Sequence, residues 1–305
     1  MSSFLRAAPG AAARLRRLLA EEDPVLAPGA YDALSARLVE EAGFPAVYMT
    51  GFGTAASHLG RPDVGLLTMT EMVDQARRIA AAVDIPVIAD ADTGYGNPIN
   101  VIRTVHEYER CGVAALHMED QEAPKKCGHI EGKRLIPAAD MVAKIEAAVE
   151  ARTDPDFVLI ARTDARAVEG MQSALERARR YRDAGADVLF VEAPQTEPEI
   201  EAVARALSDV PLLFNWAEGG RTPPVSRERL GELGFRIVIF PVGALLAAAH
   251  AVRGLLASIR ATGTPAQAMG GIVGFGDFLE MIGLPEIRRL EQRFAVQAAE
   301  HPQEG

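Results

Sequence analysis

The sequence predicts an α/β protein, a closed (β/α)8 barrel of the TIM type followed by an extra C-terminal helix. Eight short apolar runs alternate with amphipathic stretches of helical spacing along the 305-residue chain, which is typical of a parallel sheet covered by helices. The length would also fit two domains of about 150 residues each. A barrel needs about 250 residues and eight such units, so the regular alternation favours a single barrel.

The predicted strands are nearly continuous hydrophobic runs, as expected of strands that are buried on both faces. They begin at Val25, Ala46, Pro86, Val113, Phe157, Asp187, Pro211 and Arg236. Pairs such as Cys111-Gly112 and Ala184-Gly185 precede several strands, because glycine adopts the left-handed conformation that ends a helix and turns the chain. A further helix is predicted before the first strand, over residues 11–22.

The C-terminal region is predicted to be an arm outside the barrel. The eighth helix ends near Arg260, residues 263–276 are rich in Gly, Thr and Ala, and helical spacing resumes over 278–297. We therefore divide the chain into a catalytic barrel, 1–262, and a linker with a helical arm, 263–305. The arm is expected to pack on a neighbouring subunit. A helix folded back on its own barrel is the alternative.

Composition excludes several classes of function. The formal charge is −10, and no run of lysine or arginine exceeds two residues, so no nucleic-acid surface is expected. The N-terminal residues lack the apolar core of a secretory signal, and no segment has about 20 uninterrupted apolar residues. Two cysteines do not form a disulfide framework. These observations predict a soluble, cytoplasmic protein without membrane partners.

Acidic side chains follow two neighbouring strands at the face where barrel enzymes carry their active sites. Asp90 and Asp92 end the third strand, and Glu119 ends the fourth. Residues two apart on a strand share a face, and two adjacent carboxylates repel unless a cation separates them. Hard oxygen ligands suit Mg²⁺. A solvated Asp-x-Asp turn is the structural alternative.

The loop after the fourth strand contains Lys125-Lys126-Cys127-Gly128-His129. Positive neighbours favour a thiolate, so we expect the pKa of Cys127 to be lowered. One cysteine and one histidine do not make a structural zinc site. Cys127 is therefore interpreted as an acid/base group, and a nucleophilic thiol remains an alternative.

These motifs together resemble the isocitrate lyase and phosphoenolpyruvate mutase superfamily. The resemblance extends from about Pro28 to Ala261 and rests on Asp-Ala-Asp-Thr-Gly-Tyr-Gly, Glu-Asp-Gln and Lys-Lys-Cys-Gly-His. The last element is specific to the carbon–carbon lyase branch. Within that branch the chain is most similar to enzymes that cleave 2-methylisocitrate and 2,3-dimethylmalate.

The resemblance implies a set of site residues. The implied metal residues are Asp90, Asp92, Asp63 and Glu119, with Asp92 as the direct ligand and Mg²⁺ as the ion, for which Mn²⁺ can substitute. The implied substrate-binding residues are Tyr48, Thr50, Gly51, Phe52, Asp90, Lys125, Cys127, Gly128, His129, Arg162, Glu192, Asn215 and Pro241. The implied catalytic residues are Cys127, Lys125, His129, Arg162 and Glu192, and residues 125–129 correspond to a mobile gate.

The implied reaction cleaves the C2–C3 bond of a small 2-hydroxy di- or tricarboxylate, giving a 2-oxo acid such as pyruvate or glyoxylate and a carboxylate. Arg162 is expected to pair with a substrate carboxylate, and Cys127 to deliver a proton to the enolate carbon as general acid. Gate closure brings the thiol into place. The gate segment 130–133 favours a dialkylmalate-type substrate. The expected assembly is a homotetramer, a dimer of dimers with exchanged C-terminal helices.

The sequence is also compatible with three other functions. The first is oxaloacetate hydrolysis or decarboxylation, against which Pro241 argues, because the hydrolase branch tends to carry serine there. The second is phosphorus–carbon chemistry on phosphonopyruvate, and the third is a non-catalytic metabolite-binding barrel. Three residues also have structural interpretations: Arg162 as an ion-pair partner of Asp164, Glu192 as a helix cap, and Trp216 as packing.

Overall fold

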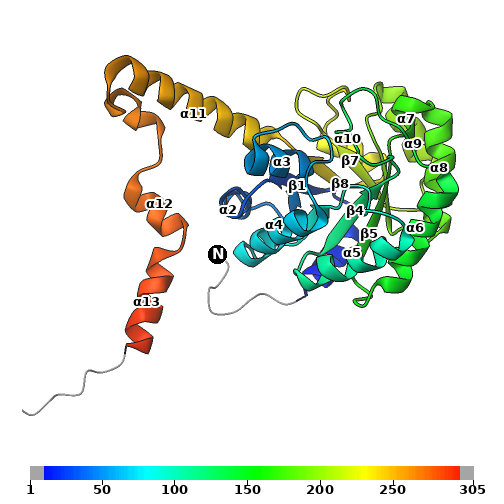
Figure 1. Ribbon diagram of the computed structural model, residues 1–305, viewed down its shortest axis with the longest axis horizontal. Coiled ribbons are helices and arrows are strands. Elements are labelled where there is room, and N and C mark those ends of the chain that lie inside the picture. The colour runs from blue at the N-terminus through cyan, green and yellow to red at the C-terminus, as the bar shows by residue number, and fades with distance from the viewer. Residues whose placement is uncertain (1–9, 296–305) are drawn as a thin grey trace, which may run out of the picture.

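A computed structural model describes residues 10–295 and shows a closed barrel of eight parallel strands (Figure 1). The strands follow the chain order around the barrel, and β8 pairs with β1 to close it. Their bounds are β1 Val25–Ala30, β2 Val47–Met49, β3 Val87–Asp90, β4 Ala115–Glu119, β5 Val158–Thr163, β6 Val188–Val191, β7 Leu212–Asn215 and β8 Phe235–Phe240. The predicted barrel is confirmed.

Helices surround the barrel, because each strand is followed by a segment that returns outside the sheet. They are α2 Ala33–Glu41, α3 Gly51–Leu59, α4 Met69–Ala82, α5 Pro98–Arg110, α6 Ala138–Ala151, α7 Ala165–Val168, α8 Met171–Asp183, α9 Glu197–Ala206 and α10 Arg227–Glu232. Gly112 and Gly185 have φ values of 89° and 101°. They turn the chain from α5 into β4 and from α8 into β6, as predicted.

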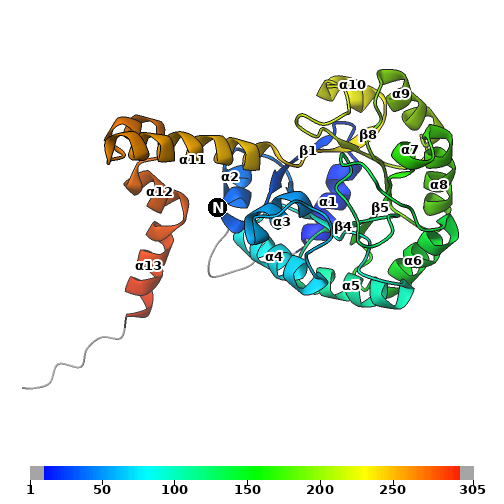
Figure 2. The same ribbon diagram turned by 45° about the horizontal axis from the view of Figure 1, so that its top comes forward.

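An N-terminal helix, α1 Ala11–Leu19, closes one end of the barrel (Figure 2). Its residues Leu15 and Leu19 belong to the same buried cluster as Val25, Ile88 and Ile160, which fill the barrel interior. A second, larger cluster lies between the strands and the surrounding helices. Because α1 fills the end of the barrel where the strands begin, the barrel is open only at the carboxyl ends of its strands.

The chain leaves the barrel after β8 (Figures 1 and 2). The arm consists of α11 Gly243–Thr262, a 3₁₀ helix Ala266–Gly271, α12 Phe275–Met281 and α13 Leu284–Phe294. No residue of α11 is buried, so the arm already begins with this helix, and the predicted boundary at 262/263 falls at its end. The helix predicted over 278–297 is interrupted at Gly283, where φ is 91°. Residues 296 and 297 lie outside the described residues.

Within residues 10–295, α11 is the one helix that is long and apolar enough to cross a membrane by length and composition. A single helix of this kind is weak evidence for a membrane span. The sequence of α11 contains His250, Arg253 and Arg260, and charged side chains are costly inside a bilayer.

Replacing Leu15 by Ala is expected to destabilise the fold by about 2–5 kcal/mol, because it leaves a cavity under the barrel. Leu15 is completely buried, whereas the neighbouring Arg17 is exposed and provides the control, Arg17→Ala. The measurement is urea unfolding followed by circular dichroism. Equal unfolding free energies for the two variants would contradict the role of α1 as part of the core.

Candidate active site

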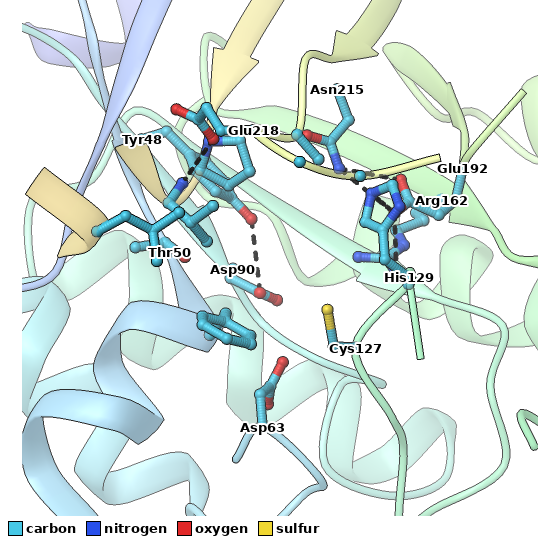
Figure 3. Close-up of a pocket in the computed structure, with 18 residues that line it drawn as sticks. Tyr48, Thr50, Asp63, Asp90, Cys127, His129, Arg162, Glu192, Asn215 and Glu218 are labelled. Carbon is cyan, nitrogen blue, oxygen red and sulfur yellow. Dashed lines mark hydrogen bonds and ion pairs between the residues drawn. The ribbon is translucent and has the colours of Figure 1, made fainter. Parts of the chain in front are cut away.

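The carboxyl ends of the strands surround a cavity of about 270 Å³ (Figure 3). The predicted site residues that line it are Tyr48, Thr50, Phe52, Asp63, Asp90, Cys127, Gly128, His129, Arg162, Glu192, Asn215 and Pro241. They come from loops and strand ends far apart in the sequence, and the closed barrel brings them together. This location agrees with the position of active sites in barrel enzymes.

Four predicted residues lie outside the lining of this cavity. Asp92 and Lys125 line a neighbouring cavity. Gly51 lies behind Asp90, and its N–H donates to Asp90 Oδ2 over 3.2 Å. A side chain at Gly51 has no room, since a Cβ there would lie 2.4 Å from the same oxygen. Glu119 lies beside Arg162, with Oε2 3.1 Å from one guanidinium nitrogen.

The two aspartates after β3 do not share a strand face. β3 ends at Asp90, and Asp92 lies in the following turn with a left-handed φ of 46°. Strand alternation therefore does not extend to Asp92, and the prediction that both carboxylates share one strand face was wrong. The two residues remain adjacent, because the Asp92 N–H donates to Asp90 Oδ1 over 2.9 Å.

A lysine ammonium bridges two of the acidic side chains. Lys125 Nζ lies 2.6 Å from Asp63 Oδ1 and 2.8 Å from Asp92 Oδ1. Burial disfavours the charge, but Asp92 and Asp63 outweigh that effect and raise the pKa of Lys125 well above its usual value. Burial raises the pKa of Asp92 to about 6, although Lys125 opposes this. Lys125 therefore serves as an internal cation for the acidic cluster.

The remaining oxygens fit a hydrated divalent cation. Glu119 Oε1 is buried and has no hydrogen-bond partner, and burial raises the pKa of Glu119 well above its usual value. Among residues 10–295, no three or more His, Cys, Asp or Glu side chains are grouped to form a complete metal cage. Mg²⁺ usually takes one or two carboxylates and keeps several waters, so this acceptor-rich, incomplete shell suits it.

The predicted gate, residues 125–129, packs against the barrel beside the cavity. The Cys127 N–H donates to the Asp63 carbonyl over 3.1 Å, and Lys133 Nζ donates to the Gly128 carbonyl. Lys133 Nζ also lies 3.5 Å from Asp164 Oδ1. A Cβ on Gly128 would lie 2.0 Å from Glu192 Oε1, so this position of the loop requires glycine there.

The Cys127 sulfur points into the cavity, between Asp63 and His129 (Figure 3). Burial raises the pKa of this thiol to about 11, and Asp63 and Glu192 contribute in the same direction. The predicted lowering of the pKa was wrong. The ammonium of Lys125 is directed toward Asp63 and Asp92, so sequence neighbours do not supply a net positive environment. The thiol is protonated at neutral pH, as a proton donor requires.

Arg162 is held by a bidentate ion pair with Asp164. Its Nε lies 2.9 Å from Asp164 Oδ2, and a second nitrogen lies 3.1 Å from Asp164 Oδ1. The ion pair with Asp164, which was the structural interpretation of Arg162, is thus present. The guanidinium also lines the cavity. Asp164 fixes the plane of the guanidinium and leaves it facing both Glu119 and the cavity.

Glu192 receives hydrogen bonds from the neighbouring strand. Asn215 Nδ2 donates to both carboxylate oxygens over 3.3 and 3.2 Å, and His129 Nε2 lies 3.3 Å from Oε1. Thr196 caps α9, so Glu192 is not the helix cap. It instead lies between Asn215 of β7 and His129 of the predicted gate.

Part of the cavity wall was not predicted. Residues 217–220, Val242 and Leu246 also line the cavity, and Glu218 accepts hydrogen bonds from the N–H groups of Val242 and Gly243 over 3.1 and 2.8 Å. Glu218 is a polar residue just after β7, so the pattern of polar residues that follow strands could have indicated it. Trp216 does not line the cavity and packs against Phe240.

The chain matches known proteins over most of its length. Residues 15–260 match the family model described as phosphoenolpyruvate phosphomutase. The chain is 48% identical to a 2,3-dimethylmalate lyase of Eubacterium barkeri, covering 93% of this chain and 98% of that protein. It is 43% identical to a 2-methylisocitrate lyase of Aeropyrum pernix, covering 94% and 92%.

Solved structures share the fold. An oxaloacetate acetylhydrolase in complex with 3,3-difluorooxalacetate superposes with a TM-score of 0.88 at 40% identity, covering 93% of this chain and 96% of that one. A phosphonopyruvate hydrolase in complex with oxalate and Mg²⁺ superposes with a TM-score of 0.85 at 34% identity, covering 93% and 98%.

Alkylation of Cys127 by iodoacetamide is expected to accelerate up to about pH 10 without a plateau, because only the thiolate reacts. With a pKa of about 11, about one thiol in a thousand is ionised at pH 8. The rate is measured by mass spectrometry of the Cys127 peptide, with N-acetylcysteine as the reference thiol. A plateau between pH 7 and 8 would show that the thiolate is stabilised instead.

Proposed function

Since the chain belongs to the phosphoenolpyruvate mutase and isocitrate lyase superfamily, in which its relatives are named lyases, we propose that it cleaves the C2–C3 bond of a 2-hydroxy di- or tricarboxylate. It is a carbon–carbon lyase. The observation that carries the substrate proposal is the protonated Cys127 thiol, which a closed gate directs into a cavity lined by Asp90, Arg162 and Glu192.

Mg²⁺, or Mn²⁺ in its place, would be held by Asp90 and Asp92, with Asp63 and Glu119 ordering its waters. When bound, it supplies Lewis-acid stabilisation of negative charge on oxygen. The acidic, incomplete oxygen shell around Lys125 supports this assignment.

The protein's own residues bind the substrate and protonate the enolate. Arg162, fixed by Asp164, faces a substrate carboxylate with a planar guanidinium whose geometry matches it. As the C2–C3 bond breaks, the C2 hydroxyl becomes the carbonyl of the 2-oxo acid and gives its proton to a carboxylate that lines the cavity. The electron pair of the broken bond stays on the departing enolate, and the Cys127 S–H supplies a proton to its carbon, which leaves a thiolate that is reprotonated by the carboxylic acid. His129 and Glu192 hold the gate closed meanwhile, so water is excluded from the enolate.

We propose a malate with a methyl group at C2 as the substrate, with 2,3-dimethylmalate as the first candidate and 2-methylisocitrate, which carries a carboxymethyl group at C3, as the second. One side of the cavity is apolar, formed by Phe52, Pro241, Val242 and Leu246. Such a wall accepts alkyl groups without leaving a polar group unpaired. The products are a 2-oxo acid, pyruvate for these two substrates, and a carboxylate.

Oxaloacetate hydrolysis is the second candidate, because an oxaloacetate acetylhydrolase shares the fold. Pro241 lines the cavity and has no hydroxyl or N–H with which to position an attacking water. This position therefore favours the lyase.

The arm supports a proposal about assembly. Leu246, Val252 and Leu256 of α11 are 51%, 52% and 58% exposed, and Phe275 farther along the arm is 80% exposed. A row of exposed apolar side chains on a projecting arm is suited to burial against another subunit. We propose a cytoplasmic homotetramer, a dimer of dimers in which C-terminal helices are exchanged.

The substrate proposal predicts that the wild-type protein with Mg²⁺ releases pyruvate from 2,3-dimethylmalate or 2-methylisocitrate in a coupled assay. Cys127→Ser is expected to reduce turnover on the order of a hundredfold or more, because a hydroxyl is a much weaker acid than a thiol. A chelator is expected to abolish activity.

Isocitrate and oxaloacetate complete the substrate panel. Oxalate release from oxaloacetate, with no cleavage of the 2-hydroxy acids, would replace the lyase proposal by the hydrolase. Equal turnover by Cys127→Ser would remove the thiol from the mechanism.

The assembly proposal predicts that Leu256→Glu lowers the molar mass measured by light scattering, because a charge would be buried at the subunit contact. Arg253→Ala, at an exposed position one turn earlier on α11, is the matched control and should keep the wild-type mass. An unchanged mass for Leu256→Glu would contradict the exchange of α11.

A further inference from the structure

His117 is a buried polar residue to which the proposed mechanism gives no role. It lies in β4 inside the barrel, and its side chain is completely inaccessible to solvent. Its ring stacks on Tyr48, with ring centroids 5.7 Å apart and planes 18° apart, and meets Phe190 edge-on at 5.8 Å. The ring is therefore fixed in position beneath the cavity.

The two ring nitrogens of His117 have different surroundings. Nε2 lies 2.8 Å from the Tyr48 hydroxyl and 3.5 Å from Asp90 Oδ1. Nδ1 is buried and has no hydrogen-bond partner in the described part of the chain. A buried N–H without an acceptor is costlier than a buried lone pair without a donor. The proton consequently belongs on Nε2.

This tautomer determines the direction of the Tyr48 hydroxyl. With Nε2–H donating to the hydroxyl oxygen, the hydroxyl proton is free to point to Asp90 Oδ2, which lies 3.5 Å away. In the opposite tautomer Tyr48 would donate to Nε2, and its oxygen lone pair would face the Asp90 carboxylate. That arrangement places two acceptors against each other and also leaves the Nδ1–H unpaired.

We infer that His117 is a positioning residue, which acts through Tyr48 to keep the single hydroxyl proton on the cavity side, where it is donated to Asp90 or, when substrate is bound, to a substrate oxygen at the cavity floor. Tyr48 and Asp90 both line the cavity, whereas His117 is completely buried and does not line it. The catalytic consequence rests on the proposed function, but the direction of the hydrogen bonds does not. The two parts therefore have separate tests.

The first test measures the tautomer directly. Nitrogen-15 NMR of ¹⁵N-histidine-labelled protein at pH 7.5 distinguishes a protonated from an unprotonated ring nitrogen, and the His117→Gln spectrum identifies the signals of His117 among the six histidines. Protonation at Nε2 alone is expected. Protonation at Nδ1, alone or together with Nε2, would overturn the inference whatever the protein catalyses.

The second test uses a double-mutant cycle. His117→Phe is expected to lower kcat on the order of tenfold or more, because the Tyr48 hydroxyl would no longer be held as a hydrogen-bond donor to the negative charge that develops on a substrate oxygen. His117→Gln should retain activity within a few-fold, because its amide N–H can replace Nε2–H. His58→Gln, a change at an exposed histidine of α3, is the control and should leave kcat unchanged.

Combining His117→Phe with Tyr48→Phe should add no further loss to that of Tyr48→Phe alone. A purely structural role would instead give additive losses and equal defects for the Gln and Phe variants, and this outcome would overturn the inference. Circular dichroism of each variant verifies folding. If no substrate is cleaved, the proposed function fails, while the NMR result still decides the inference.

Discussion

The active site depends on the compensation of buried negative charge. Asp63, Asp90, Asp92, Glu119 and Glu192 are all nearly inaccessible at the open end of the barrel. Buried carboxylates are costly unless a positive partner lies beside them. The barrel supplies one such partner, Arg162 at the end of β5, and the gate supplies another, Lys125.

Charge compensation links the position of the gate to the chemistry. Lys125 and Cys127 are two residues apart, so the loop conformation that places the ammonium between Asp63 and Asp92 also places the thiol in the cavity. The thiol therefore lies in the cavity in the same conformation in which Lys125 compensates the acidic cluster.

The sequence was sufficient for the barrel and for most of the site. Strand starts were predicted to within two residues, because the strands are buried on both faces and carry unbroken apolar runs. Arg162 and Glu192, which lie at or just after strand ends, line the cavity because the carboxyl ends of the strands of a closed barrel surround one space.

The errors concern properties that arise only in three dimensions. Asp92 was assigned to a strand face, but a left-handed turn separates it from β3. The pKa of Cys127 was inferred from adjacent lysines, whereas burial and two acidic side chains determine it. From its periodicity, α11 was also predicted to be the eighth helix of the barrel, although its apolar side chains are exposed. The partner of a side chain is not encoded by its sequence neighbours.

The order Cys-Gly-His in the gate follows from the same packing. The backbone at Gly128 passes so close to Arg162 and Glu192 that a Cβ would lie 2.6 Å from a guanidinium nitrogen and 2.0 Å from a carboxylate oxygen. The residue before it, Cys127, places its thiol in the cavity. The residue after it, His129, has its Nε2 3.3 Å from Glu192 Oε1. A loop that packs directly onto buried charges therefore needs a residue without a side chain between the thiol that faces the cavity and the ring that lies beside Glu192.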